Sequence, residues 1–293
     1  MAKEKGSNLL VTVYITTYNR REFLERAINS VLNQTHTNLE LIAADDGSTD
    51  GSQEYLQALQ NNGVLTAVPN TTGACRGACL CRNKAIKLAK GEFITGLDDD
   101  DYFEPWRVAK FIERWQTLTR EKVTFSALFD SVVEHRKDGK VDCYDAPLVP
   151  YKELRKGNFV GNQVFSTAAR FREVNGFDEK MPALQDWDTW VRLAKAKGDI
   201  ININSLSYIQ IQDHGGTRIT DKPAPKIRFA FERLMGKLAP LSKKEKVRLL
   251  YTMYGYHQMN NKLSEIVTLF FGGEFRRIAQ IIKRTLLKKN SKH

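Results

Sequence analysis

Short apolar segments alternate with amphipathic ones along the first hundred residues. Four β-branched, apolar segments predict buried strands, at Leu9–Ile15, Leu39–Ala44, Val64–Val68 and Glu92–Leu97. Apolar residues at helical spacing predict three helices, over Glu22–Leu32, from Ser48 or Asp50 to about Leu59, and over Arg82–Ala89. Because strands alternate with helices through short polar turns, we expect an α/β fold with βαβ units, a Rossmann-like, mostly parallel sheet flanked by helices.

The pattern becomes less regular after Pro105. A helix is predicted from there to about Thr117, followed by a strand over Val123–Val133 and a turn marked by Asp-Gly over Arg136–Lys140. An extended segment is predicted over Phe159–Thr167 and a helix over Asp186–Ala196. Two short strands follow, over Ile200–Ile203 and Tyr208–Gln212. Pro223 and Pro225 then interrupt the chain, and the residues beyond them are helical and basic. We therefore expect an α/β domain over residues 1–222 and a helical extension over residues 223–293.

Composition narrows the class of protein. With 293 residues and 42% hydrophobic residues, the chain can bury a full core. Residues 1–8 are too polar for a signal peptide, and the apolar runs fall short of the roughly 20 residues that span a bilayer. The four cysteines form no disulfide framework and no CxxC zinc pattern, so we expect reduced thiols in the cytoplasm.

The positive charge is concentrated at the C-terminal end. From Lys226 onward there are 16 Lys+Arg and 4 Glu, a net charge of +12, so the preceding residues sum to −1. Basic amphipathic helices commonly lie on anionic membranes, and this is our expectation for Phe270–Lys289 at the inner face of the cytoplasmic membrane. For the residues before Leu263, a helical subdomain packed on the core is an equal alternative.

Four consecutive aspartates, Asp98 to Asp101, follow the last of the predicted N-terminal strands. Carboxylates this close repel one another unless a cation lies between them. Oxygen ligands suit hard divalent ions such as Mg²⁺ or Mn²⁺, which in turn bind phosphates. The alternative is a solvated acidic loop without a ligand.

Polar clusters also follow the first two predicted strands, at Thr16–Asn19 and Asp45–Ser48. Ligands of parallel sheets bind beyond the carboxyl ends of the strands, so these clusters should meet the aspartates in one crevice. Tyr18 offers a ring on which a base can stack, and a carboxylate after the second strand can accept the N3–H of uracil. Asn19 and Ser48 are alternatively turn or helix-capping residues.

Two further segments carry candidate chemistry. Gly73–Asn83 is rich in small residues that let a ligand approach the backbone, and it ends in Arg82-Asn83. Asp186 precedes a predicted helix, where it could act as a general base or as a plain N-cap.

In this order and spacing, the segments resemble family 2 of the inverting glycosyltransferases, which have the GT-A fold. Five segments carry the resemblance: Val13–Arg20, Asp45–Asp50, Gly77–Asn83, Leu97–Asp101 and Gln185–Trp190. Two departures from the family pattern are Thr16 in place of a Pro and Gln185 in place of a Glu. Without that Glu, a negative neighbour that would raise the pKa of the base is missing.

The resemblance implies roles for individual residues. Asp186 is the expected catalytic base, and Asp98, Asp100 and His214 are the expected ligands of Mn²⁺ or Mg²⁺. Asp101 is expected to be a helix N-cap or a support of the metal ligands. The expected nucleotide-binding residues are Thr16, Tyr18, Asn19, Arg20, Asp45, Asp46, Arg82, Asn83, Asp98 and Arg218, with Asp46 as the reader of the base.

The sequence thus predicts a metal-dependent inverting glycosyltransferase that moves sugar from a UDP-sugar donor to a glycan or lipid-linked acceptor of a surface polysaccharide. The rival interpretations are a sugar-nucleotide-forming nucleotidyltransferase and a basic nucleic-acid-binding module. The first lacks its early Gly-rich basic signature, and the nearly neutral body argues against the second, so no nucleic-acid partner is expected. The pattern indicates neither the sugar, the linkage, processivity nor an oligomeric state.

Overall fold

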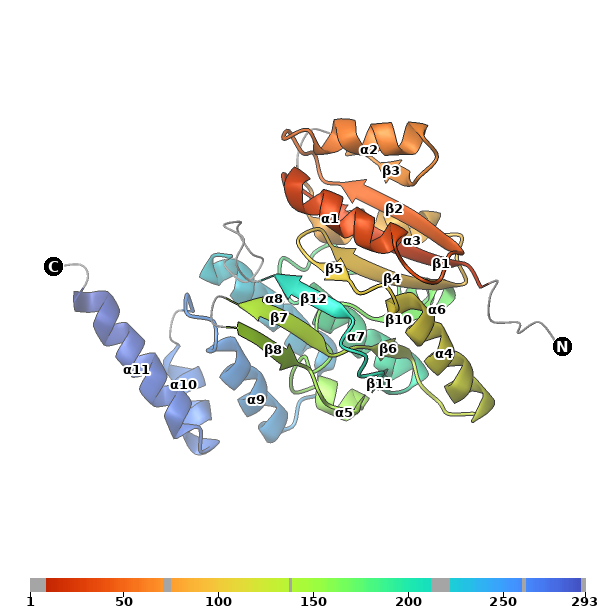
Figure 1. The fold of residues 1–293 in the computed structure, drawn as a ribbon. Coiled ribbons are helices and arrows are strands. Elements are labelled where there is room, and N and C mark those ends of the chain that lie inside the picture. Colours follow the sequence, from red (N-terminus) through yellow and green to blue (C-terminus); the bar gives the residue numbers. More distant parts are fainter. Residues whose placement is uncertain (1–8, 71–74, 137–138, 212–221, 260–261, 291–293) are drawn as a thin grey trace. The chain divides into compact units, whose positions relative to one another are not determined.

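The computed structural model describes residues 9–70, 75–136, 139–211, 222–259 and 262–290 (Figure 1). Its contacts divide the chain into two units. The first, here called the catalytic unit, comprises residues 1–151, 159–179 and 186–215. The second, here called the C-terminal unit, comprises residues 216–293 with the segments 152–158 and 180–185. The predicted boundary after residue 222 stays a prediction.

A large sheet forms the centre of the catalytic unit, with the strand order β3-β2-β1-β4-β10-β6-β11-β9. The first four strands in this order are parallel to one another, and β10 is antiparallel to β4 and β6. This confirms the α/β fold with a mostly parallel sheet. The strands span Val11–Thr17 (β1), Leu39–Asp45 (β2), Thr66–Val68 (β3), Phe93–Asp98 (β4), Ala127–Phe129 (β6), Leu148–Val149 (β9), Phe165–Thr167 (β10) and Ile200–Asn202 (β11).

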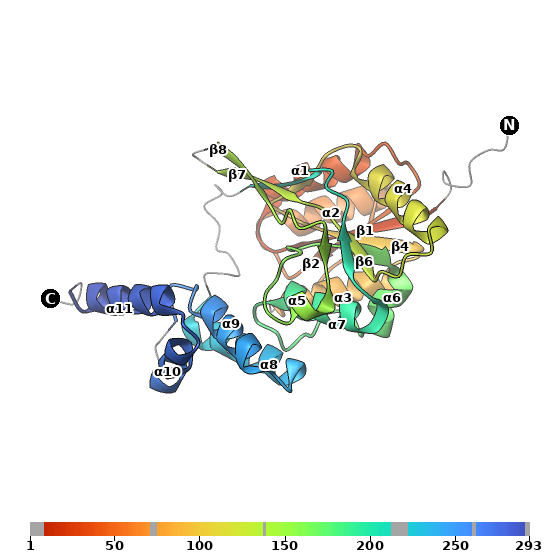
Figure 2. The ribbon, with the colours of Figure 1, turned by 90° about the horizontal axis from the view of Figure 1, so that it is seen from below.

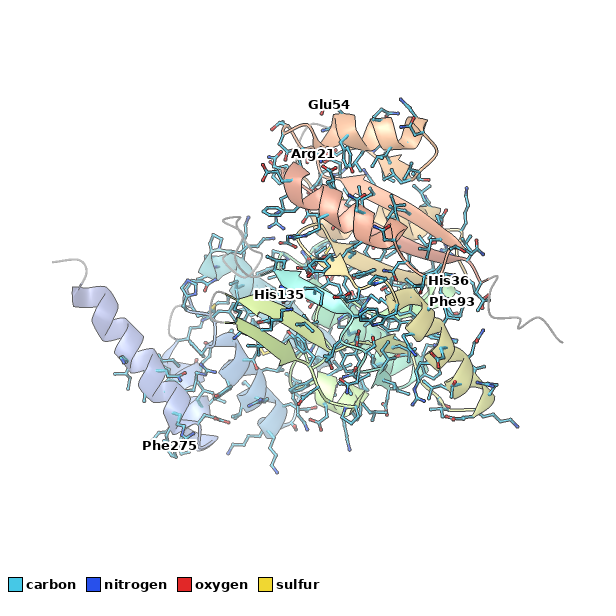
Figure 3. The ribbon with its side chains drawn as sticks, viewed as in Figure 1. Arg21, His36, Glu54, Phe93, His135 and Phe275 are labelled. Carbon is cyan, nitrogen blue, oxygen red and sulfur yellow. The ribbon has the colours of Figure 1, made fainter. Side chains whose placement is uncertain are left out.

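Helices pack on both faces of this sheet (Figures 1 and 2). The predicted apolar spacing of α1 (Arg21–Leu32) is confirmed, because Leu24, Ala27, Ile28 and Val31 are all buried beside β1 and β2. In α4 (Arg107–Arg120), the same spacing buries five apolar residues against Phe93, which is labelled in Figure 3. The other helices of this unit are α2 (Ser52–Asn61), α3 (Ala78–Leu88), α6 (Ala168–Glu173) and α7 (Gln185–Lys197).

A smaller sheet has the order β5-β12-β7-β8, built from Tyr102–Phe103, Tyr208–Ile211, Val132–Arg136 and Gly139–Cys143. The predicted hairpin is confirmed as a pairing, since β7 and β8 are antiparallel neighbours, while residues 137 and 138 of its turn lie outside the described residues. The single predicted strand Val123–Val133 is wrong, because β6 and β7 belong to different sheets. Asp130 lies at the break, where its carboxylate accepts hydrogen bonds from the Arg107 side chain at 3.2 Å and the Ser207 amide at 2.8 Å. A carboxylate committed to these donors draws the chain out of the ladder.

The extended segment Phe159–Thr167 is also shorter than predicted, and only Phe165–Thr167 forms a strand. Before it, the side chains of Asn162 and Gln163 bind the carboxylate of Asp98. The predictions missed the short elements β5, β9, α5 (Tyr151–Leu154) and α6, none of which has enough residues to show a period.

The C-terminal unit is helical, with α8 (Ala224–Leu238), α9 (Lys243–Met253), α10 (Leu263–Phe271) and α11 (Phe275–Asn290). Successive helices of this series contact one another, and apolar residues such as Phe231 and Leu249 are fully buried. A capping box starts α9, in which Ser242 and Glu245 exchange hydrogen bonds. Among the described residues, no helix has both the length and the apolar character needed to cross a membrane.

Candidate active site

The strand register aligns the predicted polar clusters at one edge of the large sheet. Thr16 in β1 lies opposite Asp98 in β4, and Thr17 lies opposite Asp45 in β2. All three strands are parallel, so their carboxyl ends meet at this edge. The expectation that these clusters converge is therefore confirmed.

Asp98 is the first residue of the acidic turn, defined here as Asp98–Asp101. One of its carboxylate oxygens accepts hydrogen bonds from Arg82 at 3.1 Å and Gln163 at 3.0 Å, and the other accepts one from Asn162 at 3.0 Å. The Arg82 guanidinium also lies 5.1 Å above the ring of Phe177. Burial lowers the pKa of Arg82, but the Asp98 charge and the other acidic groups around Arg82, among them Asp186, together outweigh burial, so the net shift is upward. The side chain therefore stays charged beside Asp98.

Asp99 and Asp100 share one arginine. The Arg20 guanidinium lies 3.0 Å from a carboxylate oxygen of Asp99 and 2.6 Å from one of Asp100. Arg26 holds the carbonyl oxygen of Asp100. Burial raises the pKa of Asp99 to about 7, although Arg20 opposes the shift. Arg20, which precedes α1, thus neutralises part of the charge of the acidic turn, and Arg26, within α1, holds its backbone.

Asp101 is buried and points toward the smaller sheet. Its carboxylate accepts a hydrogen bond from the Tyr208 hydroxyl at 2.7 Å and from the Ile211 amide at 3.2 Å. Burial raises its pKa well above the ordinary range, and the neighbouring Asp100 charge adds to the shift. No helix begins at Asp101, since α4 starts at Arg107, so the alternative of a helix N-cap is wrong.

Asp45 and Asp46 have different surroundings at the end of β2. One oxygen of Asp45 accepts hydrogen bonds from the amides of Gly47 at 2.7 Å and Ser48 at 2.8 Å, which closes a turn where Gly47 has a φ of +93°. Asp46 instead accepts hydrogen bonds from the amides of Arg76 at 2.8 Å and Gly77 at 2.7 Å, at the start of α3. In this structure the carboxylate expected to read the base is bound to the chain's own amides, so a uracil imide would have to share or replace them.

Tyr18 and Asn19 close the end of β1. The Tyr18 ring is 45% exposed, which leaves a face for stacking. Asn19 joins two turns, because its amide donates to Ser48 at 2.8 Å and its side-chain oxygen accepts from the Thr49 amide at 2.8 Å. This geometry gives Asn19 a turn role, and its contact with a nucleotide stays a prediction.

Asn83, the partner of Arg82 in the predicted pair, faces the chain itself. Its amide donates to the carbonyl of Phe177 at 2.8 Å and accepts from the Phe177 amide, also at 2.8 Å. The side chain therefore fixes the loop after α6. Its predicted nucleotide contact also stays a prediction.

Asp186 is the second residue of α7 and is partly buried. Burial raises its pKa, and Asp98 adds to this shift while Arg82 opposes it. The missing Glu at position 185 therefore does not leave the expected base with an ordinary pKa, because burial and Asp98 supply the upward shift. Asp188, the other acidic residue of this turn, forms an ion pair with Arg192 at 2.9 Å.

Trp187 and Trp190 follow Asp186 in α7 and are both buried. Trp190 packs edge-on against Phe171 and Phe177 and donates to the carbonyl of Gly161 at 2.9 Å. Trp190 is therefore a core residue, and Trp187 is equally buried, so neither ring is exposed to a sugar.

The donor set at the acidic turn fits a hard divalent ion. Asp98 and Asp100 contribute carboxylate oxygens, and Mg²⁺ sites that bind nucleotides commonly use one or two carboxylates with the phosphates as further ligands. Over the parts of the chain that the structure describes, no group of three or more His, Cys, Asp or Glu residues forms a ready metal cage. The predicted residues His214 and Arg218 lie outside the described residues.

Sequence reasoning missed Asn162, Gln163 and Tyr208, which all contact the acidic turn. The available signal was weak: two adjacent amides, Asn162 and Gln163, interrupt an otherwise apolar segment before β10. No pattern in the sequence connects that segment to residues 98–101.

Comparisons with known proteins agree with this geometry. The model of the family described as glycosyl transferase family 2 matches residues 12–175, more than half of the chain. The Escherichia coli K12 protein WcaA, provisionally described as a colanic acid biosynthesis glycosyl transferase, is 33% identical over 286 residues, which cover 94% of this chain and 99% of WcaA. The chain therefore belongs to glycosyl transferase family 2 and is a glycosyltransferase, so the nucleotidyltransferase and nucleic-acid-binding interpretations are set aside.

A second relative and a solved structure add detail. The E. coli UDP-Glc:α-D-GlcNAc-diphosphoundecaprenol β-1,3-glucosyltransferase WfaP is 35% identical over 117 residues, covering 40% of this chain and 44% of WfaP. A crystal structure of Staphylococcus aureus TarS residues 1–349 with UDP-GlcNAc has a TM-score of 0.61 and 17% identity, and covers 89% of this chain and 69% of that one. At this identity the likeness concerns the fold, which is GT-A.

Proposed function

We propose that this glycosyltransferase is metal-dependent and inverting, and that it moves a sugar from a UDP-sugar to a glycan or lipid-linked acceptor of a surface polysaccharide. One observation carries the proposal: Asp98, from the end of β4, forms an ion pair with Arg82 at 3.1 Å, and the charges of both act on Asp186, from the start of α7. The residue expected to meet the donor and the residue expected to act as base thus belong to one electrostatic site. An acidic loop without a ligand would not require this arrangement.

Inversion needs one base and one displacement. In this proposal, Asp186 removes the proton of the acceptor hydroxyl while the oxygen of that hydroxyl attacks the anomeric carbon of the donor sugar, from the face opposite the nucleotide. The bond between that carbon and the diphosphate oxygen breaks, and its electron pair leaves with UDP. The raised pKa of Asp186 makes it a stronger base than an ordinary carboxylate. A divalent ion held by Asp98 and Asp100 would supply positive charge for the departing diphosphate.

The named relatives support the donor and acceptor classes. WfaP, by its name, takes glucose from UDP-Glc to a GlcNAc linked to diphosphoundecaprenol. WcaA is described, provisionally, as a glycosyl transferase of colanic acid biosynthesis, and this chain covers nearly all of its length. We therefore propose a uridine nucleotide for the donor and a polyprenol-linked glycan as the first acceptor to test.

Thermal shift with a panel of UDP- and GDP-sugars tests the donor and the ion together. A UDP-sugar with Mn²⁺ should raise the melting temperature, EDTA should abolish the rise, and Asp100→Ala should behave like chelation because it removes a carboxylate from the ion. Asp145→Ala is the matched control, since this aspartate lies after β8 and outside the acidic turn. Full stabilisation and activity in EDTA would remove the ion from the mechanism, and a response to GDP-sugars alone would overturn the choice of uridine.

We further propose that α10 and α11 attach the enzyme to an anionic membrane. Large apolar side chains are exposed there, including Phe271 at 70% and Phe275, labelled in Figure 3, at 59%. Basic residues Arg276, Arg277 and Lys283 lie on the same helix as Phe275. Each basic residue near an anionic surface contributes on the order of 1 kcal/mol, so apolar insertion and charge together favour salt-sensitive attachment.

Liposome co-sedimentation tests the attachment. Deleting residues 263–293 should release the protein from anionic vesicles at low salt and leave transfer to a short soluble acceptor intact. Changing Phe270, Phe271 and Phe275 to Ser keeps the charge and removes the apolar contribution, so binding should weaken and become more salt-sensitive. If the full chain ignores anionic vesicles, or if the truncated chain unfolds, these helices are a packed subdomain and the attachment is wrong.

A further inference from the structure

We propose that Asn162 and Gln163 are positioning residues that hold the acidic turn in its nucleotide-binding orientation before donor or ion arrives. The inference rests on the proposed function, because it concerns the same Asp98 that is expected to meet the ion and the nucleotide. It adds a pair of residues that the motif of four aspartates does not contain.

Hydrogen-bond donors occupy most of the acceptor positions of the Asp98 carboxylate. A carboxylate offers about four acceptor positions on its two oxygens. Gln163 and Arg82 occupy one oxygen at 3.0 Å and 3.1 Å, and Asn162 approaches the other at 3.0 Å. Three donors from different directions prevent the carboxylate from rotating, and they leave room for about one more hydrogen bond or ligand.

The two amides are themselves fixed by tyrosines. The Tyr14 hydroxyl donates to the side-chain oxygen of Gln163 at 3.3 Å, which turns the Gln163 NH₂ toward Asp98. The Asn162 NH₂ also donates to the Tyr208 hydroxyl at 3.0 Å, and that hydroxyl donates onward to Asp101. One hydrogen-bonded chain therefore connects the first and the last carboxylate of the acidic turn.

Gly96 shows how closely Gln163 fits. A Cβ at this position in β4 would lie 2.1 Å from the Gln163 side-chain oxygen and 2.5 Å from the Tyr14 ring. Both neighbours are buried and hydrogen-bonded to each other, so neither can move aside without losing that bond. The absence of a side chain at Gly96 is what admits Gln163 to Asp98.

The chemistry of the amides also suits the task. Side-chain amides donate hydrogen bonds without adding positive charge, whereas further arginines or lysines would compete with a divalent ion for the carboxylates. Asn162 and Gln163 can therefore orient Asp98 and leave the negative potential of the acidic turn available to an ion.

The test compares two buried glutamines. Gln163→Met keeps a similar volume and removes both hydrogen bonds, and calorimetry should find the affinity for UDP with Mn²⁺ about 10-fold weaker. Gln34→Met is the matched control. Gln34 is also buried, and its amide bonds the carbonyls of Ser30 and Glu104 at 3.0 Å and 2.8 Å, beyond the far end of α1. This variant should lower the melting temperature and leave the affinity unchanged.

Two further measurements keep the outcomes separate. Gln163→Glu preserves the shape and places a carboxylate oxygen against Asp98, so its loss of UDP affinity should exceed that of Gln163→Met. Crystal structures of wild type and Gln163→Met without nucleotide should show the Asp98 carboxylate rotated in the variant. A Gln163→Met protein with a lower melting temperature but unchanged affinity and unchanged Asp98 orientation would overturn the positioning role. If the wild type binds no uridine nucleotide at all, the proposed function fails, and the orientation of Asp98 still decides the positioning role.

Discussion

Asp99 of the acidic turn and Glu245 of the C-terminal unit have opposite environments. Burial raises the pKa of Asp99 to about 7, although Arg20 opposes the shift. A hydrogen bond from Arg155 lowers the pKa of Glu245 to about 2, and bonds from Ser242 contribute to the same shift. In the acidic turn Asp99 and Asp100 share one arginine, whereas Glu245 has an arginine and a helix cap of its own.

This difference separates two uses of charge. Charged groups that stabilise a fold gain more from their partners than they lose on desolvation, as Glu245 does at the start of α9. Asp99 and Asp101 of the turn are desolvated and lie beside other carboxylates, which disfavours their ionised forms and so destabilises the fold at neutral pH. Proteins retain such destabilising carboxylates where a site must attract a cation and a diphosphate ester. The predictions below test whether charge serves chemistry in the first region and stability in the second.

The largest effect is expected at Asp186. Asp186→Asn should leave the affinity for UDP nearly unchanged and lower the turnover by about 10²-fold or more, since the amide cannot remove the acceptor proton. Glu245→Gln should do the reverse, lowering the melting temperature and sparing turnover of the folded protein. Steady-state kinetics with calorimetry of UDP binding distinguish the two. If Asp186→Asn keeps near-normal turnover, the base is another residue, with Asp188 next in line despite its ion pair with Arg192.

A smaller effect is expected at the nucleotide. Asp46→Ala and Tyr18→Ala should each weaken binding of free UDP by about 10-fold, through the loss of a charged hydrogen bond and of a stacking face. Asp46→Ala also removes the acceptor for the Arg76 and Gly77 amides, so its melting temperature must be measured alongside. Discrimination between UDP and CDP should fall in Asp46→Ala and persist in Tyr18→Ala. Unchanged affinity in both variants would place the uridine elsewhere.

The sequence predictions succeed where structure depends on interactions between residues near one another along the chain, and fail where it depends on distant ones. The strands β1, β2 and β4 and the helices α1, α4 and α7 have strong local periods, so the amino-acid pattern alone predicts them and the polar residues at their ends. It does not predict the partners of those polar residues, because Gln163 and Tyr208 reach the acidic turn from 65 and 110 residues away along the chain. The break between β6 and β7 has the same cause, since Asp130 is drawn to Arg107 and to residues 205–207.

The smallest expected effect, a shift of a few degrees in melting temperature, is also the most direct test of the comparison, because its sign differs between the two regions. A carboxyl with a raised native pKa binds more protons in the native than in the unfolded state, so Asp99 destabilises the protein as the pH rises from about 4 to about 7. Glu245 has a lowered native pKa, so its stabilising contribution is present above its ordinary pKa and is lost as the pH falls from about 4.5 toward about 2.

Thermal unfolding of two single variants, without nucleotide or metal, measures the sign of each contribution to stability. Asp99→Asn should raise the melting temperature at pH 8, where wild-type Asp99 is ionised, and should match wild type near pH 5, where it is protonated; Arg20 keeps Asp100 as a partner in this variant. Glu245→Gln should lower the melting temperature at pH 7, and the difference should shrink toward pH 3. Calorimetry from pH 3 to pH 8 gives both curves. If the melting temperatures of the two variants changed with pH in the same direction relative to wild type, Asp99 and Glu245 would contribute to stability in the same way. The distinction between charge that serves chemistry and charge that serves stability would then be wrong.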